Sequence, residues 1–354
     1  MSLAGLLWKE LYGLRRQAAL FVVLVLVLPG FIVAGTVVFE QTVPRDVPVG
    51  VVAADGASDD DVSVAEAALV SYTDPRGYDS ADAAEAGLER EEVYLVVFVP
   101  ANLSDPDADA SFTLVTDRTF VPFEEPVNET SEVLESQFDA AYPATVTVEH
   151  ERVGTERSLG SFLVPTGLLA FVALYGLVFV PYQLHAERRA IERVRTTTSL
   201  EQVVAAKLTF FGALLVIPAA VVALGVRWLG YDVAVFSPLA VAGVGLTFVM
   251  LAATGLSVLF FVRLDRSGLF VSVGLALGAL SLSSLLFPVG FFSSTQTVVA
   301  RALPTHYAMI TIRSGSLRET PVSLYADYLT ALLAATVVSL VVLGLAIRTY
   351  ERRC

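Results

Sequence analysis

The side chains best suited to chemistry gather in one charged stretch, residues 183–207, between two long apolar runs. Within it Arg188, Glu192 and Arg195 are three or four residues apart, a spacing that places charges on one face of a helix. Apolar residues recur on another face: Ala186, Ala190, Ile191 and Val194. This pattern predicts a short amphipathic helix. Between two apolar runs, such a helix is well placed to transmit a movement of a partner protein to both. A basic loop that merely holds the chain's orientation in a membrane would look similar.

A polar break follows this helix. Thr196, Thr197, Thr198 and Ser199 interrupt the helical pattern. Thr198 and Glu201 have the spacing of a capping box, which predicts a new helix that continues into the next apolar run. We therefore expect a helix, a break and a second helix.

Other residue sets that do chemistry are missing from the sequence. The histidines His150, His185 and His306 are far apart and lack metal-ligand spacing, so we expect no metal site. There is no Gly-x-x-x-x-Gly-Lys-Ser/Thr motif to hold nucleotide phosphates, and the apolar runs offer no catalytic triad or carboxylate pair. We predict that the chain is not an enzyme and binds no cofactor. The energy for its activity would come from another protein.

Composition places the chain in a membrane. Of its 354 residues 55% are hydrophobic and the mean hydropathy is +0.67, too apolar for a soluble domain. Six apolar runs are long enough to span a bilayer. The predicted fold class is a polytopic α-helical membrane protein with six transmembrane helices and an α/β extracytoplasmic domain inserted between spans 1 and 2. The expected parts are an interfacial amphipathic helix (1–16), the first span (17–39), the α/β domain (40–160), and spans 2–6 (161–354), which include a cytoplasmic coupling loop (184–207) and an outer, re-entrant-like segment (293–324).

Basic residues predict the orientation of the chain. Thirteen arginines and lysines fall in the short segments on one side of the membrane and four on the other, so both termini should be cytoplasmic and 40–160 outside. None of the six runs has an aspartate, glutamate, lysine, arginine or histidine in its interior, so we expect no proton or sodium relay. Such spans favour apolar or amphipathic cargo over sodium.

The segment between spans 1 and 2 has a different character. Strands are expected over 47–52, 93–99, 111–116 and 145–149, and helices after a Ser63–Glu66 capping box, over 80–89 and over 127–141. The uninterrupted apolar run 93–99 predicts a central strand covered on both faces. Both asparagines of the chain, Asn102 and Asn128, lie in glycosylation sequons. Cys354 is the only cysteine, so no intrachain disulfide supports this domain.

Charge is distributed unevenly. Of the 36 acidic residues, 27 lie between Glu40 and Arg157 with six arginines, a net charge of about −21 in that segment. Lysine occurs only at Lys9 and Lys207. This acidic, lysine-poor composition is associated with proteins of high-salt hosts, and predicts a halophilic archaeon.

Three segments resemble the permeases of ABC-2 type transporters. The loop matches the family pattern at Glu187, Ile191, Glu192, Thr197 and Lys207, and departs from it at Arg189, Ala190, Thr198 and Ala206. Residues 47–104 resemble the extracytoplasmic domain inserted after the first span in the sodium-export and drug-export-like branch. Residues 303–307 with Arg313 resemble the family's outer Leu-Pro…Arg segment, of which Pro304 and Arg313 are the candidate functional residues.

This resemblance implies a permease subunit of an exporter. It would bind no nucleotide itself, and ATP and Mg²⁺ would be held by a partner ABC ATPase. The ATPase-coupling residues would be Glu187, Arg188, Ile191, Glu192 and Thr197. Further expected partners are a second permease chain, identical or similar, and the lipid bilayer, with no nucleic acid. The alternative function is a polytopic receptor or sensor whose external α/β domain binds a ligand.

Overall fold

The computed structural model describes residues 5, 8, 47–70, 73–105, 107–119, 142, 144–194, 198–283, 285, 294–318 and 320–353. The chain forms two compact units and passes from an α/β unit to a helical unit between Phe162 and Leu163. The predicted first span (17–39) and the helix expected over 127–141 lie outside the described residues, as does the interfacial helix (1–16) apart from Gly5 and Trp8.

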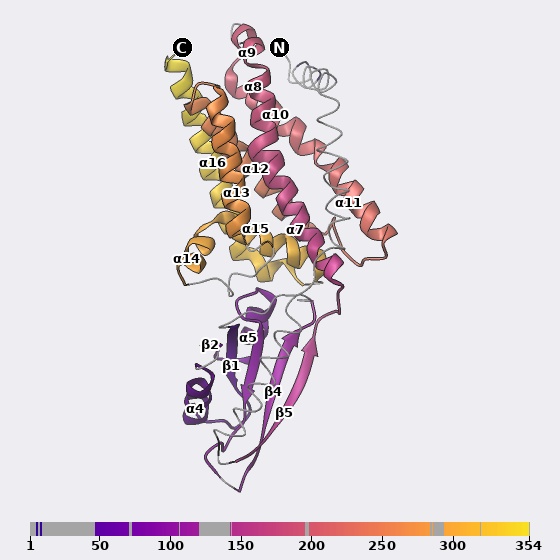
Figure 1. Ribbon diagram of the computed structural model, residues 1–354, viewed down its shortest axis with the longest axis vertical. Helices are drawn as coiled ribbons and strands as arrows, with labels where there is room; N and C mark the ends of the chain where they lie inside the picture. The colour runs from indigo at the N-terminus through magenta and orange to yellow at the C-terminus, as the bar shows by residue number, and fades with distance from the viewer. Residues whose placement is uncertain are drawn as a thin grey trace. The chain divides into compact units, whose positions relative to one another are not determined.

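Five strands form the sheet of the α/β unit (Figure 1), in the order β2-β1-β3-β4-β5. β1 pairs in parallel with β2 and β3, β3 pairs antiparallel with β4, and β4 pairs in parallel with β5. The strands are β1 (Val47–Ala53), β2 (Thr73–Gly77), β3 (Leu95–Val99), β4 (Asp109–Asp117) and β5 (Thr145–Val153). The predicted α/β domain is therefore present, and it contains one strand, β2, that the sequence did not suggest.

The central position of β3, predicted from its uninterrupted apolar run, is confirmed. Leu95, Val96 and Val97 are all fully buried although successive side chains of a strand point to opposite faces. Both faces of the strand are therefore covered. On one of them Val96 packs in a cluster with Ala84 and Leu88 of the helix α5 (Ala81–Glu89).

The helix α4 (Asp59–Leu69) begins earlier than its predicted capping box. Ser58 is its N-cap, and the reciprocal hydrogen bonds of the box join Ser58 to Asp61, whereas Ser63 lies inside the helix and donates to the carbonyl of Asp60. Asp61 Oδ1 also accepts from the backbone N–H of Leu103 at 3.0 Å, which fixes the neighbouring loop. The hydrogen bonds from Ser58 hold the pKa of the Asp61 carboxyl below its usual value.

The helical unit makes the chain a membrane protein with at least four candidate spans. These are 159–186, 200–228, 238–261 and 322–352, each long and apolar enough to cross a bilayer. Their elements are α7 (Leu159–Leu174), η3 (Tyr175–Phe179), α8 (Val180–Ala186), α10 (Leu200–Leu214), α11 (Val216–Trp228), α12 (Pro238–Phe261), η5 (Val322–Tyr325) and α16 (Ala326–Arg353). The remaining helices are α9 (Arg188–Val194), α13 (Arg266–Leu282), α14 (Ser294–Ala302) and α15 (Pro304–Leu317).

The six predicted spans are confirmed only in part. Four of the six runs are candidate spans, and a fifth, 268–292, contains the shorter apolar helix α13. The helix after the polar break does continue into the next run, as expected, but it is interrupted at Leu215. Pro218 accounts for the interruption because it has no N–H to donate to the carbonyl of Leu214.

Helix α15 lies across the ends of the long helices (Figure 1), within the segment predicted to be outer and re-entrant-like. It packs against the start of α12, where a Cβ on Gly315 would come within 2.5 Å of the Ala240 nitrogen. The backbone N–H of Ala234 donates to the carbonyl of Ser316 at 2.8 Å. Glycine at 315 therefore permits a close helix contact that no larger residue would allow.

Candidate functional site

The first described span changes helix type near its end. Tyr175–Phe179 form a π-helical turn between α7 and α8, and the N–H of Val180 bonds to the carbonyl of Tyr175. Pro181 explains the widening because its ring would clash with the carbonyl of Leu177 in a regular α-helix. The glycine of α12 that faces this turn, Gly255, has room for no Cβ: Pro181 Cγ would lie 2.7 Å and Leu177 O 2.8 Å away.

Glu187 is the junction between this span and the charged helix. Its backbone N–H bonds back into α8, to the carbonyls of Gln183 and Leu184, while its carbonyl accepts from Ala190 and Ile191 of α9. Its carboxylate accepts a hydrogen bond from Lys207 Nζ at 3.3 Å, forming an ion pair with α10. The Lys207 side chain is fully buried and that of Glu187 is 18% exposed. The ion pair therefore fastens the charged turn to the next span.

A cluster of aromatic rings continues from Lys207 into the helices. Lys207 Nζ lies 5.7 Å from the centre of the Phe211 ring, close enough for a cation–π contact. The Phe211 carbonyl accepts from the Tyr175 hydroxyl, at 3.3 Å, within the π-helical turn. Phe171, Tyr175 and Phe179 stack with 5.4 Å between successive ring centres. An unbroken series of contacts thus joins Glu187 to the π-helical turn.

The turn between α12 and α13 lies at the same end of the helical unit. Arg263 and Leu264 both have positive φ, 59° and 58°, a backbone conformation that costs a non-glycine residue about 1–2 kcal/mol. Two contacts hold the turn in this form: Leu264 is 3% exposed in the helical core, and its carbonyl accepts from His185 Nδ1 at 2.8 Å. This hydrogen bond gives His185 a structural role. It also places a hydrogen on Nδ1, because the carbonyl of Leu264 can only accept.

The predicted coupling residues lie at different depths. Arg188 is exposed, and Ile191 is fully buried in the cluster that contains Tyr175 and Phe211. The backbone of Glu192 lies in α9, although its side chain is outside the described part of the chain, as is all of Thr197. Ile191 would thus anchor α9 to the helices, leaving the arginines Arg188 and Arg189 on its surface.

The cap of α10 is Ser199 rather than Thr198. The Ser199 side chain accepts from the backbone N–H of Gln202, and Leu200 is the first helical residue. Serine is the better N-cap of the two, but threonine also serves, and the capping-box spacing of Thr198 with Glu201 favoured the threonine in the prediction.

The other candidate residues lie elsewhere. Pro304 is the first residue of α15, where a missing N–H is harmless, and Arg313 is 1% exposed and donates to the carbonyl of Leu285 at 3.2 Å. Asn102 is exposed, with φ of 65°, whereas Asn128 is outside the described residues. Pro304 and Arg313 both belong to α15, whose C-terminal half packs against the start of α12. The Glu187 turn lies at the other end of α12, where His185 contacts Leu264.

The model of the ABC-2 family of transporter proteins matches residues 19–348, nearly the whole chain. The chain belongs to the ABC-2 transporter family. Comparison with curated proteins and comparison with solved structures each gave no match. As an ABC-2 permease it is a multi-pass membrane protein that carries no catalytic activity and binds no cofactor itself. Membership of this family identifies the chain as a transporter permease and not as the alternative, a receptor.

Sequence reasoning missed the burial of Lys207 in this ABC-2 permease. A signal was available: Val203, Lys207 and Phe211 are spaced four residues apart, so the lysine lies on the apolar face of its helix. A lysine on such a face needs a carboxylate partner, and Glu187 supplies it.

Proposed function

We propose that this permease is the membrane subunit of an ABC exporter, powered by a separate ATPase that docks on the turn formed by α8, α9 and the start of α10. ABC-2 permeases generally pair with ABC ATPases. The observation that carries the proposal is the Glu187–Lys207 ion pair, which ties α9 to both spans. A displacement of α9 by the ATPase would act on the two spans together, because neither end of the turn is free to move alone.

The π-helical turn gives this displacement a place to act. The contacts run from Glu187 through Lys207 and Phe211 to Tyr175, and π-helical turns are frequent at functional sites. ATP hydrolysed on the partner would thereby shift the packing between α8 and α12. Residues that contact the ATPase would come from the exposed arginines and from Glu192 and Thr197, while Glu187 and Ile191 would hold α9 in place.

The orientation and assembly complete the proposal. Both termini and the α9 turn would be cytoplasmic and the α/β unit outside, because arginine and lysine are concentrated in the short segments on one side of the membrane.

The permease would work with a second permease chain, identical or similar. Along α13, Gly274 and Gly278 have no described atom within 4 Å of a Cβ position, so this small-residue face is open to a partner helix, whereas Gly243 already packs on α15. Cargo would be amphipathic, in a host adapted to high salt.

The docking proposal is tested by charge reversal on the surface of α9. Arg189 is exposed, and among the described residues it has no ion-pair partner, so Arg189→Glu should leave folding intact. We expect stimulation of the partner ATPase by the reconstituted permease to fall about tenfold, in the range of lost interface charges. The matched control is Arg352→Glu, an exposed arginine on α16. Equal stimulation in the wild type and Arg189→Glu would reject α9 as the docking site.

A further inference from the structure

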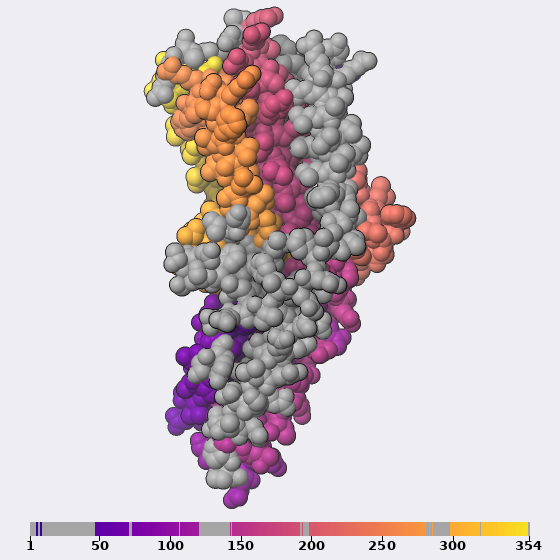
Figure 2. Space-filling model, viewed as in Figure 1, coloured from indigo at the N-terminus to yellow at the C-terminus, as the bar shows by residue number. Residues whose placement is uncertain are grey.

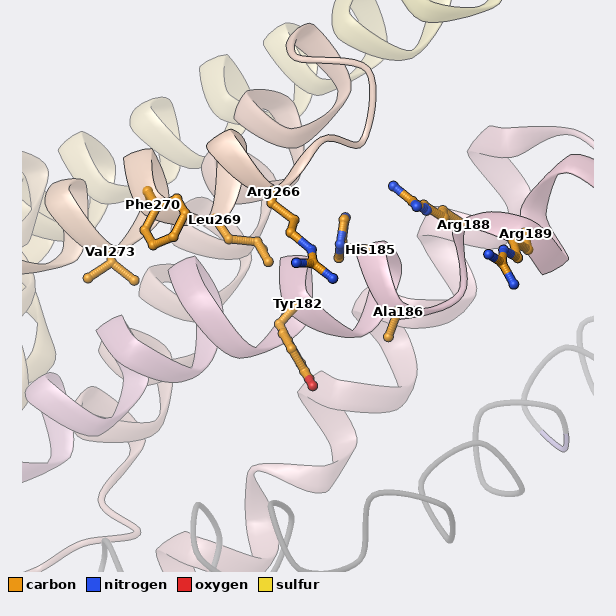
Figure 3. Close-up of a pocket in the computed structure, with 9 residues that line it drawn as sticks. All are labelled: Tyr182, His185, Ala186, Arg188, Arg189, Arg266, Leu269, Phe270 and Val273. Carbon is orange, nitrogen blue, oxygen red and sulfur yellow. The ribbon is translucent and has the colours of Figure 1, made fainter.

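A pocket of about 560 Å³ opens beside the α9 turn, between α8, α9 and the start of α13 (Figure 3). Its volume is in the range of small-molecule sites. Its polar lining consists of Tyr182, His185 and three arginines, Arg188, Arg189 and Arg266. Arg188 extends toward Arg266 and His185, whereas Arg189 points away from them (Figure 3). Two guanidinium groups from different helices therefore face one space.

Acidic groups near the pocket have other partners. Asp265 precedes Arg266, but its carboxylate caps α13 by accepting from the backbone N–H and the hydroxyl of Ser267. Glu187 faces Lys207. Among the described residues no carboxylate forms an ion pair with Arg188 or Arg266. The two guanidinium groups thus have no ion-pair partner among the described residues, although the Asp265 carboxylate interacts electrostatically with His185.

The other wall of the pocket is apolar and exposed. Leu269, Phe270 and Val273 follow Arg266 along α13 (Figure 3), and the Phe270 side chain is 78% exposed. Figure 2 shows α13, in orange, open on this face of the molecule beside the magenta helix of residues 159–186. Exposed apolar residues continue along the helix at Leu277, which is 58% exposed. Such a surface on a membrane protein faces acyl chains, except where a partner helix packs along Gly274 and Gly278.

We propose that this pocket binds an anionic phospholipid. The lipid phosphate would lie between Arg188 and Arg266, whose planar guanidinium groups can each donate two hydrogen bonds to phosphate oxygens. One acyl chain would run along Phe270 and Val273. Arginines at one end of an apolar helix lie at the depth of lipid headgroups, and basic pockets between membrane helices recognise them. The inference requires no ATPase, although Arg188 is also one of the exposed arginines of the proposed docking surface.

The test measures lipid retained by the full-length permease alone. Purified permease is exchanged into phosphatidylcholine nanodiscs containing a fixed small fraction of phosphatidylglycerol, and lipids retained after delipidation are counted by native mass spectrometry. We expect preferential retention of phosphatidylglycerol. Arg266→Gln and Arg188→Gln should each weaken it about fivefold, the effect of roughly 1 kcal/mol per arginine, and Arg352→Gln should not change it.

Two further arms separate the source of the phosphate and the role of the apolar wall. Phe270→Asn should weaken lipid retention, whereas Val341→Asn, a substitution at an exposed residue of α16, should not. Glycerol phosphate without acyl chains should fail to displace the lipid. Equal retention of phosphatidylcholine, unchanged retention in both arginine variants, or displacement by glycerol phosphate would each overturn the proposal. The thermal unfolding midpoint of every variant is measured as a control for misfolding. Because Arg188 and Arg266 are exposed, their variants should keep the wild-type midpoint.

Discussion

At the scale of single residues, the Glu187–Lys207 pair is unusual because one member is completely shielded from water. An ammonium group in such a place is tolerated only when a carboxylate compensates it. Removing one partner leaves a buried charge alone, whereas removing both leaves an apolar contact. The pair therefore secures the geometry of the turn more than it adds to stability.

This distinction predicts a non-additive pair of variants. Glu187→Gln should lower the free energy of unfolding by about 2–4 kcal/mol, because Lys207 then lacks its carboxylate. The double variant Glu187→Gln/Lys207→Met should be more stable than Glu187→Gln. The measurement is the thermal unfolding midpoint of the detergent-purified permease, with Glu201→Gln, an exposed carboxylate of α10, as control. A Glu187→Gln midpoint equal to that of the control would show that the pair is unimportant.

At the scale of elements, sequence patterns predicted what depends on local periodicity. β1, β3, β4 and β5 and the helices α5 and α10 are where the apolar spacing indicated. β2 was missed because its residues include Pro75 and Gly77, which are unfavourable in a strand and are tolerated here because β2 is an edge. The cap of α4 was predicted five residues late, at Ser63, and that of α10 one residue early, at Thr198, since several serines and threonines with suitable spacing compete at each start.

The candidate site was harder to predict than the fold. Its charged helix, α9, was recognisable from the residues, and so was the polar break after it. The ion pair joins residues 20 positions apart across that break, so no helical spacing reveals it. The π-helical turn follows from Pro181, but Pro165 lies within α7 without such a turn, so a proline in the sequence does not by itself reveal one.

The close approach of α12 to the π-helical turn predicts opposite effects of one substitution at two glycines. Gly255→Ala should destabilise the permease by about 1–3 kcal/mol, because its Cβ would meet the backbone of Leu177. Gly245→Ala, on the same helix, has no described atom within 4 Å and should stabilise it by up to about 1 kcal/mol through helix propensity. Thermal unfolding midpoints that shift in the same direction for both would contradict the packing described.

At the scale of the whole molecule, the orientation of the permease can be tested with its single cysteine. Replacing Cys354 by serine gives a cysteine-free background, into which one exposed residue is changed at a time. Glu85→Cys on α5 should react with a membrane-impermeant maleimide in intact cells. Glu201→Cys, at the start of α10, should react only after the membrane is permeabilised.

The two cysteines form mutual controls, because each reports when the other should be silent. Labelling of Glu201→Cys in intact cells would reverse the orientation and remove α9 from the reach of a cytoplasmic ATPase. The lipid pocket would survive that result, since headgroups occur at both surfaces of a bilayer.

The π-helical turn also sets the phase of the helix on either side of it. In an α-helix a step of four residues overshoots one turn by about 40°, whereas in a π turn of roughly 4.4 residues it falls short by about 30°. The deviations of the step from Phe171 to Tyr175 and of the step from Tyr175 to Phe179 therefore nearly cancel, which keeps the three stacked rings on one side of the helix. One residue fewer in this turn would rotate everything beyond it by about 100°. Glu187 faces Lys207 only because the helix has one residue more than a regular α-helix would use.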